Sequence, residues 1–420
     1  MWRTLAFVEH VEVEFSGNLI NQALILGDVD NDQKEELILG NIEGDLFIFK
    51  GDGPSAWRKG SDLGMITCIR AGDFCNRGKN NLICLTAEGW CYIFDIKPDG
   101  IPEDDECDGD RSVKPAYTQH LPANGKVMLI ADTDNDSQTE MVVGYSDRVV
   151  RIFRWVSAPE GEPYTSGRII QLQQWQLAGQ IGSITVNHSQ DGQCELMASQ
   201  PGGTFVTLLH DQGSHSDSDE PKQQCLIYHP LGSSRARNKD VSTIIIGGIS
   251  RDKKDKSEPS STYYALATLD GTLSLVESDK ILWSLQVDHQ LFSMHKMDVT
   301  GNGKEEVVCC SWDGQIYIVN HSKEVVRYHF EENVAGFTAG HYCLTSEGDV
   351  PCFIFATFHN RIFIYYNISL PQVESINLLQ VINKREEMQH VLTKLNIDPQ
   401  NKESLRRFYQ WCLYGWQNKS

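Results

Sequence analysis

The chain has 420 residues and carries 57 acidic against 37 basic side chains, which gives a formal net charge of −20. Its composition, with 40% apolar and 22% charged residues, is typical of a folded globular protein and excludes a disordered or fibrous chain. The acidic balance disfavours nucleic acid or an anionic membrane surface as a direct partner, because both are bound by clustered basic side chains.

The N-terminal segment predicts a strand rather than a targeting signal. Glu9, Glu12 and Glu14 lie where a signal peptide would need its apolar run, and no stretch approaches the roughly 18 apolar residues of a membrane span. Apolar and polar residues alternate within residues 7–15, which is the pattern of a β-strand. We therefore expect a soluble protein of the cytosol with a strand near its N-terminus.

An internal repeat sets the predicted architecture. Residues 24–40 and 129–144 agree in kind at nearly every position, and a third copy runs through residues 294–314. Each copy consists of an apolar strand, an Asp-rich loop, a second apolar strand, a tight turn and a third strand. Weaker copies of the same unit are centred on residues 81–89, 195–203, 262–271 and 352–360.

Seven turns mark the seven copies. Neighbouring turns are as close as 43 residues (271 to 314), a spacing that suits four-stranded blades. Two of the turns are Asp-Gly pairs, which supply the positive φ that a hairpin requires. The turn positions are Gly44, Gly89, Arg148, Gly203, Gly271, Gly314 and Asn360. The sequence thus predicts an all-β fold, a seven-bladed β-propeller that occupies residues 1–370.

The ring must also be closed. The last blade has three predicted strands and lacks an outer one, and we predict that the strand within residues 7–15 fills that place and covers two sheet edges. Polar inserts interrupt the repeat and are expected to be solvated loops, since they hold too few apolar residues to offset the entropy of ordering. The inserts lie near residues 99–112, 210–224 and 251–261.

The hydrophobic period changes after the last blade. Apolar residues recur at helical spacing in residues 388–395 and again in residues 405–413. Residues 371–420 are therefore predicted to form a short helical tail. Two interpretations of the tail stay open: the helices pack on the propeller, or the second helix, with Trp411 and Trp416 beside its apolar stripe, binds a partner.

Two of the Asp-rich loops carry the pattern D-x-D-x-D-x-x-x-E. Oxygen ligands at positions 1, 3, 5 and 9 of a tight loop can converge on a hard cation, and calcium accepts six to eight such oxygens. The candidate ligands are Asp28, Asp30, Asp32 and Glu36 in the first loop and Asp132, Asp134, Asp136 and Glu140 in the second. A third loop, with Asp298, Asn302 and Glu306, is a weaker candidate because Thr300 and Asn302 replace two carboxylates.

A second interpretation of these loops needs no metal. Asp and Asn side chains can accept hydrogen bonds from nearby backbone N–H groups, and such Asx turns alone would stabilise the loops. Position 6 is Gln33 or Ser137 in the first two loops, where a metal loop favours Gly, and Lys34 adds a positive charge. Both interpretations stay open at this point.

The sequence contains neither a G-x-S-x-G elbow nor a P-loop, so we predict that the protein is not an enzyme. Asp288 and His289 are interpreted as a structural pair. The 12 scattered cysteines are expected to be reduced and mostly buried. Four tryptophans in or beside predicted strands are expected to pack between blades, namely Trp90, Trp155, Trp283 and Trp312.

The segment 27–40 and its copies resemble the FG-GAP repeats of the integrin α-subunit propeller. Several segments are also similar to the integrin-α FG-GAP repeat-containing protein 2 family, at residues 27–32, 87–90, 143–151, 287–292 and 298–303. The resemblance implies a propeller over all seven repeats. It also implies a metal-binding role like that of the integrin loops, but only for the loop positions named above.

The same resemblance implies a non-catalytic subunit of KICSTOR, a scaffold that holds the GATOR complex at the lysosome and thereby restrains target-of-rapamycin signalling when amino acids or glucose are short. The implied partners are kaptin, the very large seizure-threshold scaffold protein and other KICSTOR subunits, with GATOR contacted indirectly. The implied location is cytoplasmic, with recruitment to the lysosomal membrane surface and no membrane insertion. No cofactor is required, and calcium is a candidate ligand. The alternative is a calcium-dependent ligand-binding or glycan-processing propeller.

Overall fold

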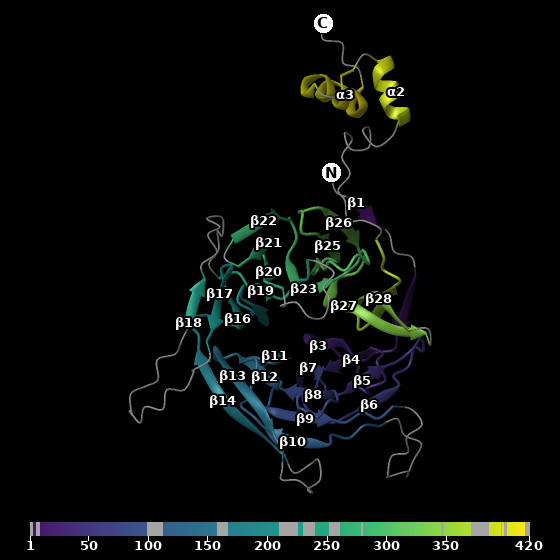
Figure 1. Ribbon diagram of the computed structural model, residues 1–420. Coiled ribbons are helices and arrows are strands. Elements are labelled where there is room, and N and C mark those ends of the chain that lie inside the picture. Colours follow the sequence, from purple (N-terminus) through teal and green to yellow (C-terminus); the bar gives the residue numbers. More distant parts are fainter. Residues whose placement is uncertain are drawn as a thin grey trace.

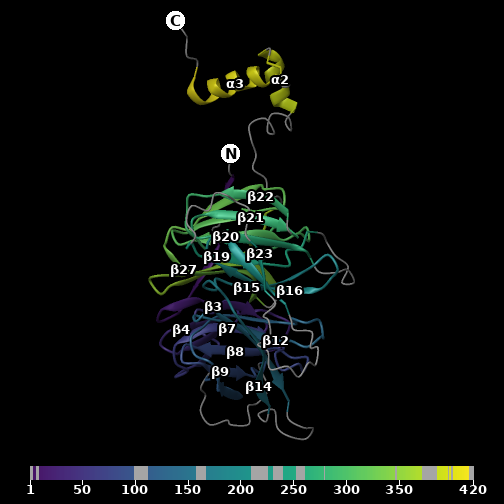
Figure 2. The same cartoon turned by 90° about the vertical axis from the view of Figure 1, so that its left-hand side faces the viewer.

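Seven sheets form a ring around a central axis, which confirms the predicted seven-bladed β-propeller (Figure 1). Figure 2 shows the same ring from its side. The computed structural model describes residues 3–5, 9–98, 112–157, 167–209, 226–229, 240–251, 261–278, 280–345, 348–370, 386–395, 397–398 and 401–415.

Each blade is a sheet whose strands follow one another in chain order from the centre of the ring to its rim, except that blades 6 and 7 each gain an N-terminal strand at the rim (Figure 1). Blade 1 consists of β3 (Leu19–Gly27), β4 (Glu36–Asn41), β5 (Leu46–Phe49) and β6 (Arg58–Gly60). Blade 2 consists of β7 (Ile66–Gly72), β8 (Asn81–Thr86), β9 (Trp90–Phe94) and β10 (Tyr117–His120). Blade 3 consists of β11 (Gly125–Ala131), β12 (Glu140–Tyr145), β13 (Val149–Val156) and β14 (Arg168–Gln176).

The remaining four blades repeat this arrangement. Blade 4 consists of β15 (Ile184–His188), β16 (Cys194–Gln200), β17 (Thr204–Leu208) and β18 (Leu226–His229). Blade 5 consists of β19 (Thr243–Ile246), β20 (Tyr263–Thr268), β21 (Thr272–Glu277) and β22 (Lys280–Gln286). Blade 6 consists of β23 (Leu291–Met297), β24 (Glu306–Ser311), β25 (Gln315–Val319) and β26 (Val325–His329). Blade 7 takes β27 (Val334–Thr345), β28 (Gly348–Thr357) and β29 (Ile362–Tyr366) from the C-terminal end of the ring.

The N-terminal strand closes the ring, as predicted. Strand β2 (His10–Val13) pairs antiparallel with β29 and becomes the outer strand of blade 7. A second, unpredicted strand, β1 (Arg3–Leu5), pairs parallel with β26 at the rim of blade 6. The N-terminus therefore covers the edges of two neighbouring blades, where unpaired backbone groups would otherwise be exposed.

All seven predicted turn positions have positive φ. The angles range from 59° at Asn360 to 99° at Gly44. At Gly44 an added Cβ would lie 2.8 Å from the backbone nitrogen of Gly64, so this turn has no room for a side chain. The turn signal in the sequence thus locates every blade.

The core lies between blades, because each blade covers the faces of its two neighbours. Leu37, Ile38 and Leu39 of β4 are all fully buried. Leu37 and Leu39 belong to the cluster shared with blade 7, whereas Ile38 belongs to the cluster shared with blade 2. Successive side chains of a strand point to opposite faces, so a strand that is covered on both faces is continuously apolar.

The C-terminal tail contains two helices, α2 (Glu386–Lys394) and α3 (Lys402–Tyr414), which lie beyond the rim of the ring in Figures 1 and 2. Asn401 caps α3 by accepting the backbone N–H groups of Glu403 and Ser404 at 3.0 and 3.3 Å. Neither described helix is long and apolar enough to cross a membrane. The predicted boundary between propeller and tail stays a prediction, because residues 371–385 lie outside the described part.

Several smaller predictions have mixed outcomes. Trp155 and Trp283 are buried as expected, but Trp90 and Trp312 are 42% and 44% exposed. Both exposed tryptophans flank tight turns at the ends of strands, since Trp90 begins β9 and Trp312 follows β24, so they do not lie in the middle of a blade. Nine of the ten described cysteines are buried or half-buried, and all ten are free. The predicted inserts lie almost entirely outside the described residues.

Candidate functional site

The three strong Asp-rich loops occupy equivalent places in blades 1, 3 and 6. Each loop connects the innermost strand of its blade to the second strand. Its last carboxylate is the first residue of that second strand, where Glu36, Glu140 and Glu306 pair in register with the last residue of the inner strand. All three glutamates are at most 3% exposed. The fold therefore buries one carboxylate at the same point in each of these blades.

Backbone N–H groups hold this buried carboxylate in the same way three times. Glu36 Oε2 accepts the N–H of Val29 at 3.1 Å. The equivalent N–H groups in the other blades lie 2.9 Å from Glu140 Oε2 and 3.0 Å from Glu306 Oε2. These bonds orient one oxygen of each glutamate into its loop.

The loop aspartates form the Asx turns that the second interpretation predicted. Asp28 Oδ2 accepts the N–H of Gln33 at 3.0 Å. Asp30 Oδ1 accepts the N–H of Asp32 at 3.2 Å, and Asp32 Oδ1 accepts that of Lys34 at 2.9 Å. Blade 3 repeats all three bonds from Asp132, Asp134 and Asp136. In blade 6 the first and last of them are made by Asp298 and Asn302.

The sixth loop position has a left-handed backbone in every copy. Its φ is 68° at Gln33, 65° at Ser137 and 84° at Gly303. The first two loops therefore adopt the tight conformation without the glycine that favours it, at a cost of about 1 kcal/mol each. The absence of glycine from the sequence pattern did not prevent the loop from forming.

Lys50 occupies the centre of the blade 1 loop. Its ammonium nitrogen lies 2.5 Å from Asp30 Oδ2, 2.7 Å from Asp32 Oδ2 and 3.0 Å from Glu36 Oε1. Lys50 reaches this point because it follows β5, the strand that pairs with β4 with Leu37 opposite Phe49. One residue beyond the end of this ladder, Lys50 comes to lie beside Glu36.

Arg154 occupies the same place in blade 3. Its Nη2 lies 2.8 Å from Asp136 Oδ2 and 3.2 Å from Asp134 Oδ2, and it also forms an ion pair with Glu140. The register is again the same, since Met141 pairs with Phe153 and places Glu140 beside Arg154. A basic side chain thus meets loop positions 3, 5 and 9 in both blades.

Neither basic residue was predicted from the sequence, although the position of each carries a signal. Lys50 and Arg154 each lie six residues after the tight turn of their blade, at Gly44 and Arg148. The same count from Gly314 reaches Asn320 in blade 6. The spacing from turn to loop therefore predicts which side chain faces the carboxylates.

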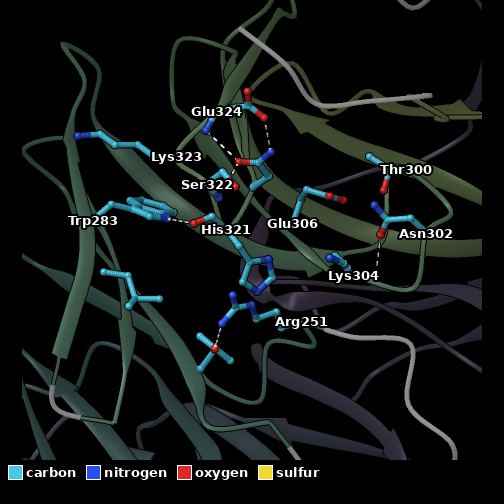
Figure 3. A pocket seen from close by; sticks show the side chains of 13 residues that line it. Arg251, Trp283, Thr300, Asn302, Lys304, Glu306, His321, Ser322, Lys323 and Glu324 are labelled. Atoms are coloured by element: carbon cyan, nitrogen blue, oxygen red, sulfur yellow. Dashed lines mark hydrogen bonds between the residues drawn. The ribbon is translucent and has the colours of Figure 1, made fainter.

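Blade 6 has no basic residue in this place. The Asn320 amide donates to Glu324 Oε2 at 2.8 Å, and its oxygen accepts the backbone N–H groups of Ser322 and Glu324. Within the described part of the chain, Glu306 has no ion pair. A pocket of about 660 Å³ opens here, and Figure 3 shows Glu306 between the 322–324 turn and the loop that holds Thr300 and Asn302.

The local charges change the protonation equilibria of these groups. Burial, together with the negative charge of a neighbouring aspartate, Asp298 or Asp30, raises the pKa of Glu306 and that of Glu36 to about 7. Burial opposes a charge on Lys50, yet its hydrogen bonds to Asp30 and Asp32 hold its pKa above the ordinary range. Lys50 therefore stays cationic at any physiological pH.

In each of the first two loops the three aspartates bring one carboxylate oxygen each to within 4.8 Å of one another, as a metal ion would require, but a basic side chain already contacts two of the three. Calcium would need carboxylate oxygens of positions 1, 3, 5 and 9 at 2.3–2.6 Å, and three of these four positions are the ones that a basic side chain contacts. In blades 1 and 3 those same oxygens contact Lys50 or Arg154. Calcium binding in the three loops stays a prediction, and only the blade 6 loop has its carboxylate free of a basic side chain among the described residues.

The loops also connect neighbouring blades. Asn31 in the blade 1 loop accepts the N–H of Asn80 in blade 2 at 2.7 Å and donates to its carbonyl oxygen at 3.1 Å. Asn76 of blade 2 makes the same two bonds with Thr139 of blade 3, at 2.6 and 3.2 Å. Loop conformation and blade contact are therefore coupled.

The remaining candidate residues do not form a catalytic arrangement. His289 pairs with Asp313 at 2.6 Å and not with Asp288, which corrects the predicted pair. The pairing across blade 6 arises because the turn at 313–314 comes close to the loop before β23. The central channel, a cavity of about 780 Å³, is lined in part by Arg70 and His295. Burial lowers the pKa of His295 to about 4, and its Nε2 lies 3.0 Å from the carbonyl oxygen of Phe337.

Comparisons with known proteins agree with this architecture. A model of the integrin-alpha FG-GAP repeat-containing protein 2 family matches residues 50–370. The chain is 41% identical over 428 residues to the mouse (Mus musculus) protein named KICSTOR complex protein ITFG2, which covers 98% of this chain and 96% of the relative. It is 41% identical over 400 residues to the protein of the same name from Bos taurus, covering 90% of this chain and 74% of that relative.

Solved structures support the fold alone. The crystal structure of BBS1N in complex with ARL6DN, soaked with mercury, is similar with a TM-score of 0.57 and 13% identity, covering 88% of this chain and 97% of that one. The same complex soaked with lead has the same TM-score and identity, covering 89% of this chain and 100% of that one. The family match and the two mammalian relatives show more than the fold. They show that this chain belongs to the integrin-alpha FG-GAP repeat-containing protein 2 family.

Proposed function

We propose that this protein is a non-catalytic subunit of a KICSTOR assembly, in which it helps to recruit the GATOR complex to lysosomes and to restrain target-of-rapamycin signalling during amino-acid or glucose shortage. The observation that carries the proposal is the 41% identity to a KICSTOR complex protein over 98% of this chain. The partners that follow are kaptin, the seizure-threshold scaffold protein and other KICSTOR subunits. The location that follows is the cytoplasm, with recruitment to the lysosomal surface by the assembly.

The geometry of the described residues supports a binding role over a catalytic one. The buried carboxylates of blades 1 and 3 are engaged by basic side chains of the same blade, which leaves neither group available for proton transfer to a substrate. The His289–Asp313 pair has no nucleophile among the residues that line its shallow pocket. Blades 1 and 3 therefore contribute structural charge pairs, which suits a protein that presents its surfaces to partners.

Two regions expose the aromatic and apolar side chains that interfaces use. The first region, called the turn face here, consists of the tight turns of blades 6 and 7. On it Trp312 is 44% and Phe358 59% exposed. In the tail, Leu395 and Trp411 are 49% and 45% exposed. Aromatic residues are enriched at the energetic centres of protein interfaces, so both regions are candidate contacts for the assembly.

Gentle purification from cells tests the proposal directly. The tagged full chain should return kaptin and the other KICSTOR subunits in fixed proportion, as quantified by mass spectrometry. Recovery of a lone chain from cells that contain those partners would contradict the proposal.

Variants then separate the two candidate surfaces. Truncation after residue 383 should reduce co-purification if the tail binds the assembly, while the circular dichroism and melting temperature of the propeller stay unchanged. Trp312→Ala with Phe358→Ala should do the same if the turn face is used. Trp90→Ala, an equally exposed tryptophan beside a different turn, is the matched control.

A further inference from the structure

Two Asp-rich loops of this propeller have the acidic pattern of a calcium loop and a basic side chain in the middle of it. We propose that Lys50 and Arg154 replace the metal ion in blades 1 and 3, so that these blades keep their shape without calcium. The inference concerns the fold of the ring and is independent of the KICSTOR assignment.

The two basic side chains contact three of the four carboxylate positions that a bound ion would use. Lys50 Nζ lies within 3.0 Å of one oxygen from each of loop positions 3, 5 and 9. In blade 3 a single guanidinium nitrogen, Arg154 Nη2, contacts the oxygens of the same three positions. Two different side chains thus converge on one point that is defined by the repeat, which indicates a site for positive charge rather than a chance ion pair.

Across the three loops, the charge of the residue six after the turn varies together with the charges at loop positions 3 and 5. Where positions 3 and 5 are aspartates, the residue six after the turn is Lys50 or Arg154. Where those positions are Thr300 and Asn302, the equivalent residue is Asn320. A loop that relied on calcium would keep its acids without needing a basic side chain, so this joint change favours internal neutralisation.

The two basic side chains are also partly buried by their surroundings. The Lys50 side chain is only 18% exposed, and its nitrogen lies 5.0 Å from the centre of the Trp57 ring. The Arg154 side chain is 19% exposed. A calcium ion at the same oxygens would have to displace a partly buried cation or sit beside it, and like charges at such distances repel strongly in a partly buried site.

Terbium luminescence can test blade 1 without interference from other loops. Terbium is a hard, calcium-like ion, and Trp57 is close enough to sensitise its emission when the ion sits in place of Lys50. The proteins compared are the full-length wild type, Lys50→Met, Trp57→Phe and the double variant. Any terbium in blade 6 contributes equally to each protein, so only a signal that depends on Trp57 reports on blade 1.

We expect wild type and Trp57→Phe to emit equally, because Lys50 fills the blade 1 position. Lys50→Met should gain emission that excess calcium removes and that the double variant lacks. Emission from wild type that depends on Trp57, or no gain in Lys50→Met, would overturn the proposal. If Lys50→Met does not melt cooperatively, Lys50→Gln provides a second variant that keeps hydrogen-bonding capacity.

A thermal measurement extends the test to blade 3. The melting temperature of Arg154→Met should rise when calcium replaces chelator, since a ligand that binds only the folded state stabilises it. The conservative variant Arg154→Lys should show a smaller rise because it retains the cation. Equal calcium shifts in these two variants would contradict the assignment of the cation's place to Arg154.

Discussion

Blades 1 and 6 share a register but neutralise their Asp-rich loops differently. Both bury a glutamate that accepts a backbone N–H from the loop, Glu36 in one and Glu306 in the other. Blade 1 adds two aspartates and a lysine that contacts all three acids. Blade 6 lacks both the aspartates and the lysine, and opens a pocket instead. The comparison teaches that the repeat conserves the shape of the loop by Asx hydrogen bonds, while its charge can be balanced either by a cation or by removing acids.

The largest expected effect follows from breaking the blade 1 cluster. Lys50→Met leaves three carboxylates together without a cation, and removal of one partner from a buried ion pair typically costs about 3 kcal/mol of unfolding free energy. Urea denaturation at pH 8 measures this loss. Lys304→Met, which removes an exposed lysine from the blade 6 loop, should stay within about 0.5 kcal/mol of wild type. Equal effects would show that Lys50 has no special role.

The second prediction concerns Glu306 in blade 6, the blade whose loop has no basic side chain at its centre. Its pKa is raised from 4.5 to about 7 in the folded state, so the unfolded chain releases this proton at lower pH than the folded one. The contribution of Glu306 to stability is therefore fully present below about pH 4.5 and is lost as pH rises toward 7. Glu306→Gln mimics the protonated acid and should lose less stability than wild type between pH 5 and 8, by roughly 2–3 kcal/mol.

The control for this pH dependence is Glu331→Gln, which changes an exposed glutamate of the same region. Its urea midpoints should follow wild type at every pH. A Glu306→Gln variant with the same pH slope as wild type would indicate that Glu306 is already ionised in the folded protein.

Transferring the lysine to blade 6 sharpens the comparison further. Asn320→Lys places an ammonium where the register of β24 and β25 puts it opposite Glu306, since Val307 pairs with Val319. The new cation should lower the pKa of Glu306 and reduce the pH slope of stability by about 1–2 kcal/mol between pH 5 and 8. Asn320→Gln, which cannot carry charge, should leave the slope unchanged even if lost turn bonds lower stability overall.

The smallest expected effect concerns the backbone of the two loops. Gln33→Gly relieves a side chain at φ 68° and should stabilise the protein by about 0.5–1 kcal/mol. The reverse change in blade 6, Gly303→Ala at φ 84°, should destabilise by about 1 kcal/mol. Urea midpoints measure both. A loss on Gln33→Gly would mean that the Gln33 side chain contributes more than its backbone strain costs.

Much of the fold was predictable because its signals are local and repeated. An apolar second strand and a turn residue such as Gly44 recur seven times, and the Asp-rich loop recurs in three of the copies, so each copy corroborates the others. The closing strand was predictable from a missing outer strand and the alternation at Val11 and Val13, since one unpaired sheet edge needs one partner. The Asx turns were one of the two interpretations that the pattern of loop acids left open.

The neutralising cations could be assigned only by the tertiary structure. In the chain, Lys50 lies 20 residues from Asp30, and that separation alone does not tell whether the two meet. The β4–β5 ladder decides it, because a two-strand register brings the residue six after the turn opposite the residue that begins the second strand. The sequence determined the acids, the turns and the ring, whereas the pairing of strands decided that the charge at the centre of two loops comes from the chain's own Lys50 and Arg154.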